Sequence, residues 1–305
     1  MLLIFLKRVL AAIPVLIIVA SLTFFFVRLA PGGPFDTDRA VSEEVLINLQ
    51  EAYNLNAPIS EQYFDYMSGV LVGDFGPSFR YPGRGVSEMI YTGLPVTLEL
   101  AIYAILIAVL VGVFAGVLAA LKRNTILDFI PMAIAMIGIC VPTFLMGPLL
   151  VLIFGINLEL LPVSGWGNLP GDKILPSITL GFAYAAYIAR LSRGGMLEVL
   201  SQDFIRTARA KGLSERVVVT KHAMQGGLIP VVSFLGPAVA GLLAGSFVVE
   251  TIFHIPGLGR FYVEADFNRD YTMILGTTIF FSAMIVFFNL LSDMAVMILN
   301  PRARD

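Results

Sequence analysis

A polar, basic stretch at residues 206–230, RTARAKGLSERVVVTKHAMQGGLIP, interrupts a chain that is 57% hydrophobic, and apolar segments flank it on both sides. Its lysines and arginines allow two interpretations. The stretch can be an ordinary cytoplasmic loop whose charges only set the orientation of a membrane protein, since positively charged loops resist translocation. Alternatively, it is a structured surface to which a partner binds. Spacing alone is compatible with both.

Residue patterns typical of enzymes are absent from the sequence. No lysine has the glycine context of a G-x-x-x-x-G-K-[ST] loop, so ATP binding by such a loop is excluded. The lack of H-E-x-x-H and G-x-S-x-G argues against an intramembrane hydrolase. The single cysteine, Cys140, excludes an internal disulfide, and His222 and His254 do not read as a metal-ligand pair. We expect no catalytic site, cofactor or metal in this chain.

The sequence around the basic residues predicts their secondary structure. One face of an amphipathic helix is indicated by Met196, Leu197, Leu200, Phe204 and Ala208. Arg206, Arg209 and Lys211 fall on the other side. Gly212 can take the left-handed conformation that ends a helix, and Ser214 can cap a second one with its side chain. The stretch therefore predicts a helix, a glycine corner and another helix.

The apolar segments predict an all-α membrane protein. A bilayer core about 30 Å thick needs roughly 20 apolar helical residues. Six stretches of a single domain, 1–305, meet this requirement: 9–30, 97–121, 126–155, 174–193, 231–253 and 272–299. The third contains Pro131, Pro142 and Pro148, so we expect a kink or a break within it.

The distribution of positive charge predicts the orientation of these helices. With the N-terminus inside, 13 of the 20 lysines and arginines lie on the inner side, whereas 16 of the 22 acidic residues lie outside or at outer helix ends. Both termini are therefore expected in the cytoplasm, with residues 194–230 forming a cytoplasmic loop and residues 31–96 a long external loop after the first helix.

The external loop is too long to be a simple connection. Residues 42–53 and 60–71 each read as a helix with one apolar side, and GDFGPS at 73–78 predicts a turn. The loop can be a cap that packs only on the membrane helices, or a docking surface for an external partner. We favour the docking surface.

Three residues of the fifth span are candidates for a translocation path or for helix packing. Gly241 and Gly245 are four residues apart, a small-residue spacing that allows close helix contact. Glu250 lies at the outer end of the same segment and can be merely interfacial. Trp166, the only tryptophan, lies where an aromatic residue at the membrane surface is expected.

The chain resembles the oligopeptide, dipeptide and nickel permeases of ABC importers. The resemblance is carried by FIRTARAKGL, KHAM and LIP in the basic stretch, by GDFG in the external loop and by PGLG at 256–259. In the general importer loop, Arg206, Thr207 and Ala208 occupy the places of Glu-Ala-Ala. His222, Met224 and Gln225 stand where Ile, Leu and Pro are usual, which is a departure from the general pattern.

The resemblance implies a type I ABC-importer fold and a role as one of two related permease subunits in a bacterial cytoplasmic (inner) membrane. The implied partners are a second permease subunit, two cytoplasmic ATPase subunits that bind ATP and magnesium, and an extracytoplasmic peptide-binding protein, besides the lipid bilayer and without nucleic acid. The loop would dock on an ATPase subunit. Its implied coupling residues are Phe204, Arg206, Thr207, Ala208, Arg209, Ala210, Lys211, Gly212 and His222.

Several alternatives stay open at this point. Oligopeptides are the favoured substrate, but dipeptides, nickel and glutathione are transported within the same family. An ion-coupled secondary transporter is the alternative from a different class. Such carriers usually bury acidic residues near the membrane midplane, whereas the ionisable residues here, such as Glu99, Asp128 and Asp293, lie near the ends of the expected spans.

Overall fold

The computed structural model describes residues 2–30, 32–35, 47, 50, 51 and 53–299. The predicted helix at 42–53 therefore lies largely outside the described residues. The elements, in chain order, are α1 (Leu2–Leu29), α3 (Ile59–Leu71), α4 (Val86–Leu121), α5 (Ile126–Cys140), α6 (Thr143–Leu150), the π-helical η1 (Val151–Asn157), α7 (Ile174–Leu200), α8 (Asp203–Ala210), α9 (Glu215–Val217), the π-helical η2 (Val218–Ala223), α10 (Met224–Gly227), α11 (Ile229–Ile252), α12 (Leu258–Asn268) and α13 (Tyr271–Leu299).

The predicted helical membrane protein is confirmed. Five helices, α1, α4, α7, α11 and α13, are long and apolar enough to cross a membrane. The pair formed by α5 and by α6 with η1 is apolar enough only when taken together and is bent by 112°, so it adds a sixth span if it crosses as one broken unit and is otherwise a re-entrant loop. The expected break lies at Pro142. Val141 before it has an extended ψ of 118°, because the proline ring disfavours a helical conformation in the preceding residue.

The second span starts earlier than its apolar composition indicates. We expected it at 97–121, but α4 begins at Val86 and runs for 36 residues. Its first turns pack in a cluster of buried side chains with α12 and α13 that includes Met89, Ile90, Leu258 and Met273. Tertiary contacts outside the predicted span therefore extend the helix into the segment that we had assigned to the external loop.

A seam of glycines joins α4 and α7, which run parallel. A Cβ atom at Gly112 would lie 2.6 Å from the carbonyl oxygen of Ala185, and one at Gly116 would overlap that of Ala189. On the α7 side of the seam, a Cβ at Gly181 would lie 2.6 Å from the carbonyl oxygen of Ala104 in α4. Lipid provides no hydrophobic driving force for helix association, so membrane helices associate through close van der Waals packing. Glycine allows the two backbones to approach this closely.

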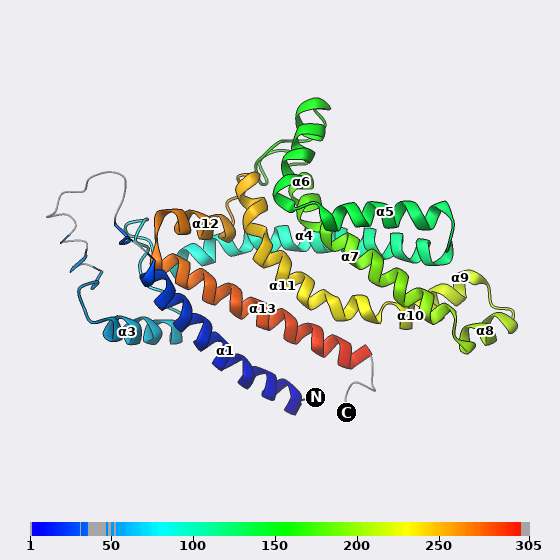
Figure 1. Cartoon of the computed structure of the whole chain (residues 1–305), viewed down its shortest axis with the longest axis horizontal. Coiled ribbons are helices and arrows are strands. Elements are labelled where there is room, and N and C mark those ends of the chain that lie inside the picture. The colour runs from blue at the N-terminus through cyan, green and yellow to red at the C-terminus, as the bar shows by residue number, and fades with distance from the viewer. Residues whose placement is uncertain (1, 31, 36–46, 48–49, 52, 300–305) are drawn as a thin grey trace.

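Two helices, α5 and α11, pack against α7 of this pair, α13 packs against α11, and α1 packs against α13 (Figure 1). The helices α8 and α9 lie at one end of the elongated molecule, and α3 and α12 lie at the other. Arg8 and Asp293 form an ion pair that joins the N-terminal part of α1 to the C-terminal part of α13. The two ends of the described chain therefore lie together.

The segment after α3 is fastened to the start of α13. Asp270 is buried, and its carboxylate accepts hydrogen bonds from the backbone N–H groups of Phe79 (3.1 Å), Arg80 (3.2 Å) and Met273 (3.2 Å). The expected turn at 73–78 is present, since Gly73 and Gly76 have φ of 80° and 82°. The predicted helix at 60–71 is also present, as α3.

The α4–α7 seam makes a testable prediction about assembly of the bundle. Gly116→Ala should destabilise the protein by about 1–3 kcal/mol, because the added methyl group overlaps the backbone of α7 and the helices must separate. Thermal unfolding of the detergent-solubilised protein measures the loss. Gly194→Ala is the matched control, since nothing lies within 4 Å of a Cβ there. Equal stability of the two variants would show that the seam is not close-packed.

Candidate functional site

The short helix α8 is held by one apolar side. Ile205 and Ala208 are buried in a cluster formed by the ends of α4 and α7 and by η2; its other buried members are Ala120, Met196, Val199, Val218, Val219 and Ala223. Because α8 contacts η2 and shares this cluster with the ends of two membrane helices, a displacement of α8 must shift the cluster as a whole or open it.

The predicted single helix across 196–208 is wrong. The chain leaves α7 after Leu200 and starts α8 at Asp203, with Ser201 and Gln202 between them. This interruption shifts the helical phase. Ile205 is consequently 0% exposed, whereas Phe204, which we expected on the apolar side, is 46% exposed.

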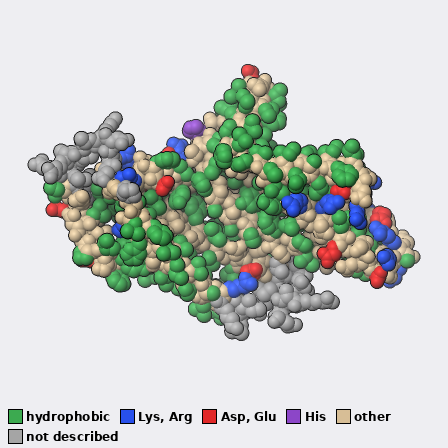
Figure 2. All heavy atoms as spheres, in the orientation of Figure 1, with side chains coloured by type: hydrophobic (Ala, Val, Ile, Leu, Met, Phe, Trp, Pro, Cys, Tyr) green, Lys and Arg blue, Asp and Glu red, His purple; other side chains and the backbone are tan. Residues whose placement is uncertain are grey.

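The outward side of α8 carries most of the predicted coupling residues. Exposed positions among them are Phe204, Arg206, Thr207, Arg209, Ala210, Lys211 and Gly212, whereas Ala208 is buried and His222, in η2, is half-buried. Figure 2 shows charged side chains of both signs at this end of the molecule. The surface is therefore mixed in charge, with one aromatic ring exposed on it.

Local ion pairs neutralise part of this surface. Arg206 Nη1 lies 3.2 Å from Asp203 Oδ1, and Arg209 Nε lies 2.7 Å from Glu215 Oε1. The hydrogen bond between Arg209 and Glu215 lowers the pKa of the carboxyl group and raises the pKa of the guanidinium. This second pair also joins α8 to α9 across the glycine corner.

Gly212 forms the expected corner. Its φ is +79°, in the left-handed region that glycine enters without a Cβ penalty, and its N–H donates to the carbonyl of Arg209 (2.9 Å). Nothing lies within 4 Å of a Cβ placed there, so backbone conformation and not space requires glycine. Ser214 lies at the N-cap of α9, but its side chain makes no capping hydrogen bond, contrary to our expectation.

At the other end of the bundle, Glu250 is 0% exposed and connects three elements. Its carboxylate accepts hydrogen bonds from the Thr97 hydroxyl (2.8 Å) and from the backbone N–H of Arg260 (3.0 Å), and the Thr97 oxygen accepts one from Leu258 N–H (2.8 Å). The carboxylate thus fastens the start of α12 to α4 and α11. Its role in a translocation path stays a prediction.

The two glycines of α11 have different surroundings. A Cβ at Gly241 would overlap the hydroxyl of Tyr184 on α7, whereas nothing lies within 4 Å of a Cβ at Gly245. Within this chain, Gly241 therefore belongs to a helix contact, and only Gly245 leaves open space beside its helix.

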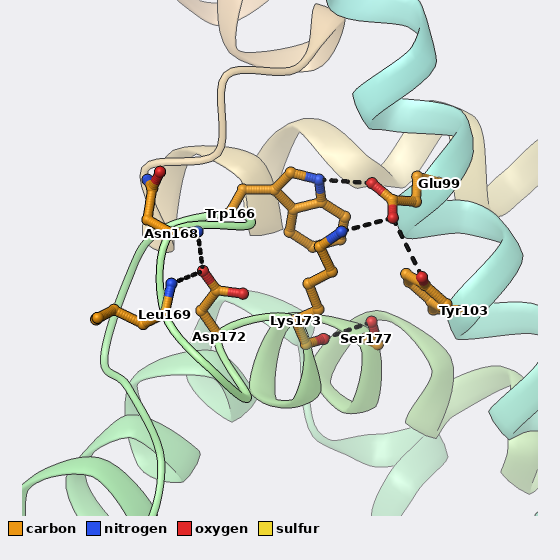
Figure 3. A network of polar contacts seen from close by, with 8 residues as sticks. All are labelled: Glu99, Tyr103, Trp166, Asn168, Leu169, Asp172, Lys173 and Ser177. Carbon is orange, nitrogen blue, oxygen red and sulfur yellow. Dashed lines mark hydrogen bonds and ion pairs between the residues drawn. The ribbon is translucent and has the colours of Figure 1, made fainter.

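A network of polar side chains that we did not predict from the sequence lies between α4 and the segment before α7 (Figure 3). Lys173 Nζ is 2.6 Å from Glu99 Oε1, and Trp166 Nε1 donates to Glu99 Oε2 at 3.0 Å. The hydrogen bond to Glu99 raises the pKa of Lys173. The ion pair of Glu99 and Lys173 was missed because the two residues are far apart in sequence. The available signal was that Glu99, Lys173 and Trp166 lie near the ends of two predicted spans.

Comparison with known proteins identifies the family. Residues 112–305 match the family described as binding-protein-dependent transport system inner membrane component, and residues 1–101 match the N-terminal family of the same membrane component. The chain belongs to this family of transport-system membrane proteins. The expected ABC-importer permease family is thereby confirmed.

Relatives of known function cover nearly the whole chain. The oligopeptide transport system permease protein OppB of Haemophilus influenzae is 44% identical over 299 residues, and that of Salmonella typhimurium is 46% identical over 300 residues; each alignment covers 98% of both chains. The dipeptide transport system permease protein DppB of Bacillus subtilis is 42% identical over 298 residues, covering 98% of this chain and 96% of the relative.

Solved structures support the fold. The MetNI methionine ABC transporter, in an inward-facing conformation, contains a chain that superimposes with a TM-score of 0.59 at 18% identity, covering 70% of this chain and 96% of that one. The architecture of this family member is therefore that of an ABC importer permease of type I.

Proposed function

We propose that this chain is the membrane-spanning permease subunit of an ABC importer for oligopeptides and forms half of the translocation pathway. Its 46% identity over nearly the full length to an oligopeptide permease carries the proposal. Dipeptides are the second candidate, because a dipeptide permease is 42% identical over a similar length. Nickel and glutathione are the further alternatives that the family resemblance implies.

The proposed partners follow from the division of labour in such a system. A second permease subunit completes the pathway, two cytoplasmic ATPase subunits bind ATP and magnesium, and an extracytoplasmic protein delivers the peptide. This chain contributes the outward side of α8, which we assign as the surface that an ATPase subunit contacts. Phe204 supplies the apolar anchor there, since Arg206 and Arg209 already pair with acids of their own chain.

The proposed coupling is mechanical. Closure of the ATPase dimer displaces α8, and the buried side chains Ile205 and Ala208 transmit that displacement to the ends of α4 and α7. Because packed cores respond by shifting as units and not by continuous deformation, the membrane helices change between inward-open and outward-open arrangements.

The proposed orientation places α8 and both chain termini in the cytoplasm and α3 and α12 outside a bacterial inner membrane. It rests on the excess of lysine and arginine on the α8 side. The ion pair between Arg8 and Asp293 supports a common side for the two termini.

Replacing Gly212 by valine tests the coupling role. A β-branched residue in the left-handed region is strained by roughly 1–2 kcal/mol, which corresponds to about a 5–30-fold change in an equilibrium. We expect Gly212→Val to insert and assemble normally but to lose most of the ATPase stimulation by peptide-loaded binding protein. The measurement is ATP hydrolysis and peptide uptake by the complex reconstituted in vesicles.

Gly83→Val is the matched control for this experiment. Gly83 has the same φ of +79° and equally open surroundings, but it lies in the segment between α3 and α4, at the other end of the molecule. It should leave ATPase stimulation unchanged. Full coupling in Gly212→Val, or an equal loss in Gly83→Val, would contradict the assignment of α8 as the docking element.

Cysteine labelling tests the orientation. In a Cys140→Ala background, a cysteine at the exposed Asp266 of α12 should react with an impermeant maleimide in intact cells, whereas one at the exposed Ser214 should react only after the membrane is opened. The charge distribution is the physical reason for this difference. Labelling of the Ser214 position from outside would reverse the proposed topology.

Gly245 tests the translocation path. We expect Gly245→Leu to assemble and to hydrolyse ATP but to reduce peptide uptake severalfold, because a side chain then fills the open space beside α11. Gly241→Leu, which meets Tyr184, should instead lower the amount of folded protein. Unchanged uptake with Gly245→Leu would place this residue against lipid, and failed assembly would place it in a subunit contact.

A further inference from the structure

A cleft of about 790 Å³ lies between α4, α7 and the segment 167–173 that leads into α7. Leu106 and Leu110 of α4 form one wall, and Ile174 and Ile178 of α7 form another. This volume is within the range of roughly 300–1,000 Å³ that is typical of small-molecule sites. The cleft is separate from α8 and from Gly245.

The cleft is polar at one end and apolar along its length. Tyr103, Asn168 and Lys173 line the end nearer to α12. From Tyr103 to Leu110 the lining continues along α4 for about 10 Å, at a rise of about 1.5 Å per residue, with only apolar side chains at Leu106, Ile107 and Leu110. The polar end coincides with the expected start of two membrane spans, and the apolar part extends towards their middle.

A pair of opposite charges with spare hydrogen-bonding capacity lies at the polar end (Figure 3). Both side chains are partly exposed, at 33% for Lys173 and 37% for Glu99. Lys173 lines the cleft, whereas Glu99 lies next to the lining and is bonded to two lining residues, Lys173 and Tyr103. Glu99 accepts from Lys173, Trp166 and Tyr103, which leaves one lone-pair position, and Lys173 keeps further donors. Asp172 is occupied by the backbone N–H groups of Asn168 and Leu169.

The shape and charge of the cleft select its occupant. A peptide backbone along the apolar part would leave polar groups without hydrogen-bond partners, at a cost of about 1–3 kcal/mol each. A hydrocarbon chain has no such groups. The paired lysine and glutamate together carry no net charge, and Asp172 in the lining adds one negative charge. The polar end therefore disfavours a headgroup that is only anionic and complements one that contains both an anion and a cation.

We propose that this cleft binds a phosphatidylethanolamine molecule of the surrounding bilayer. One acyl chain lies between α4 and α7, the phosphate contacts Lys173, and the primary ammonium contacts Glu99. Trp166 borders the headgroup, at the depth where tryptophan is enriched in membrane proteins. The site assigns a lipid-binding role to a region outside the proposed coupling and translocation surfaces.

Lipid retention by the purified complex tests the proposal. The complex is reconstituted in nanodiscs with equal amounts of phosphatidylethanolamine and phosphatidylglycerol, extracted in mild detergent, and analysed by native mass spectrometry. Wild type should retain phosphatidylethanolamine preferentially. Glu99→Gln leaves Lys173 without its neutralising partner and should shift the retained ratio towards phosphatidylglycerol by about two- to fivefold, the range for a partly exposed charge pair.

Two matched substitutions locate the acyl chain and the headgroup. Leu106→Trp fills the cleft and should lower retention, whereas Phe114→Trp, an exposed position further along α4 that does not line the cleft, should not. Glu88→Gln removes an exposed carboxylate that pairs with Arg84 away from the cleft and should leave the ratio unchanged.

Three results would overturn the proposal. They are equal retention in wild type and Leu106→Trp, an unchanged lipid ratio in Glu99→Gln, and displacement of the lipid by a transported oligopeptide, which would make the cleft a peptide site. Elution of every variant as an assembled complex in size-exclusion chromatography separates these results from misfolding.

Discussion

Close backbone contact between α4 and α7 is the constraint on which the rest of the structure depends. In a bilayer, lipid tails are as apolar as leucine, so two helices stay together only if their surfaces fit at short range. Gly112, Gly116 and Gly181 allow that fit. The seam places the ends of both helices beneath α8 at one end of the bundle and leaves the lipid-sized cleft beside them nearer to the other end.

Buried or half-buried carboxylates join elements of the bundle. Asp128 of α5 receives two hydrogen bonds from Arg193 of α7, at 2.6 and 2.9 Å, and Glu250 of α11 fastens the start of α12. A buried carboxyl group is costly unless it is hydrogen-bonded or paired with a cation, so the Arg193 partner of Asp128 and the hydrogen bonds of Glu250 stabilise one relative position of the helices. They are structural contacts near helix ends, which fits a permease moved by partner subunits better than an ion-coupled carrier.

The same physics explains the two ends of the molecule. At α8, the buried side chain of Ile205 joins this short helix to a cluster that includes the ends of α4 and α7. In the proposed mechanism, a force on the exposed side of α8 is transmitted through this cluster to the membrane helices. At α12, hydrogen bonds of Glu250 and Asp270 hold irregular segments against α4 and α13. In the proposed mechanism the permease responds as rigid units and uses both attachments, because a loosely held end would absorb a displacement instead of transmitting it.

The sequence by itself determined the features that depend on local properties. Apolar length predicted the spans, three prolines predicted a kink or break in the third one without fixing its position, and Gly212 predicted a left-handed corner. Each follows from hydrogen-bonding and steric rules that act within a few residues. The family resemblance also came from local motifs.

Only the tertiary structure decided which residues face one another. Helical periodicity could not predict that Ile205 and not Phe204 is buried, because Ser201 and Gln202 shift the phase between α7 and α8. It could not separate Gly241, against Tyr184, from the open Gly245. Glu99 and Lys173 are distant in sequence and meet only because α4 and α7 pack in parallel. Periodicity defines the faces of one helix, whereas the partner of each face is set by long-range packing.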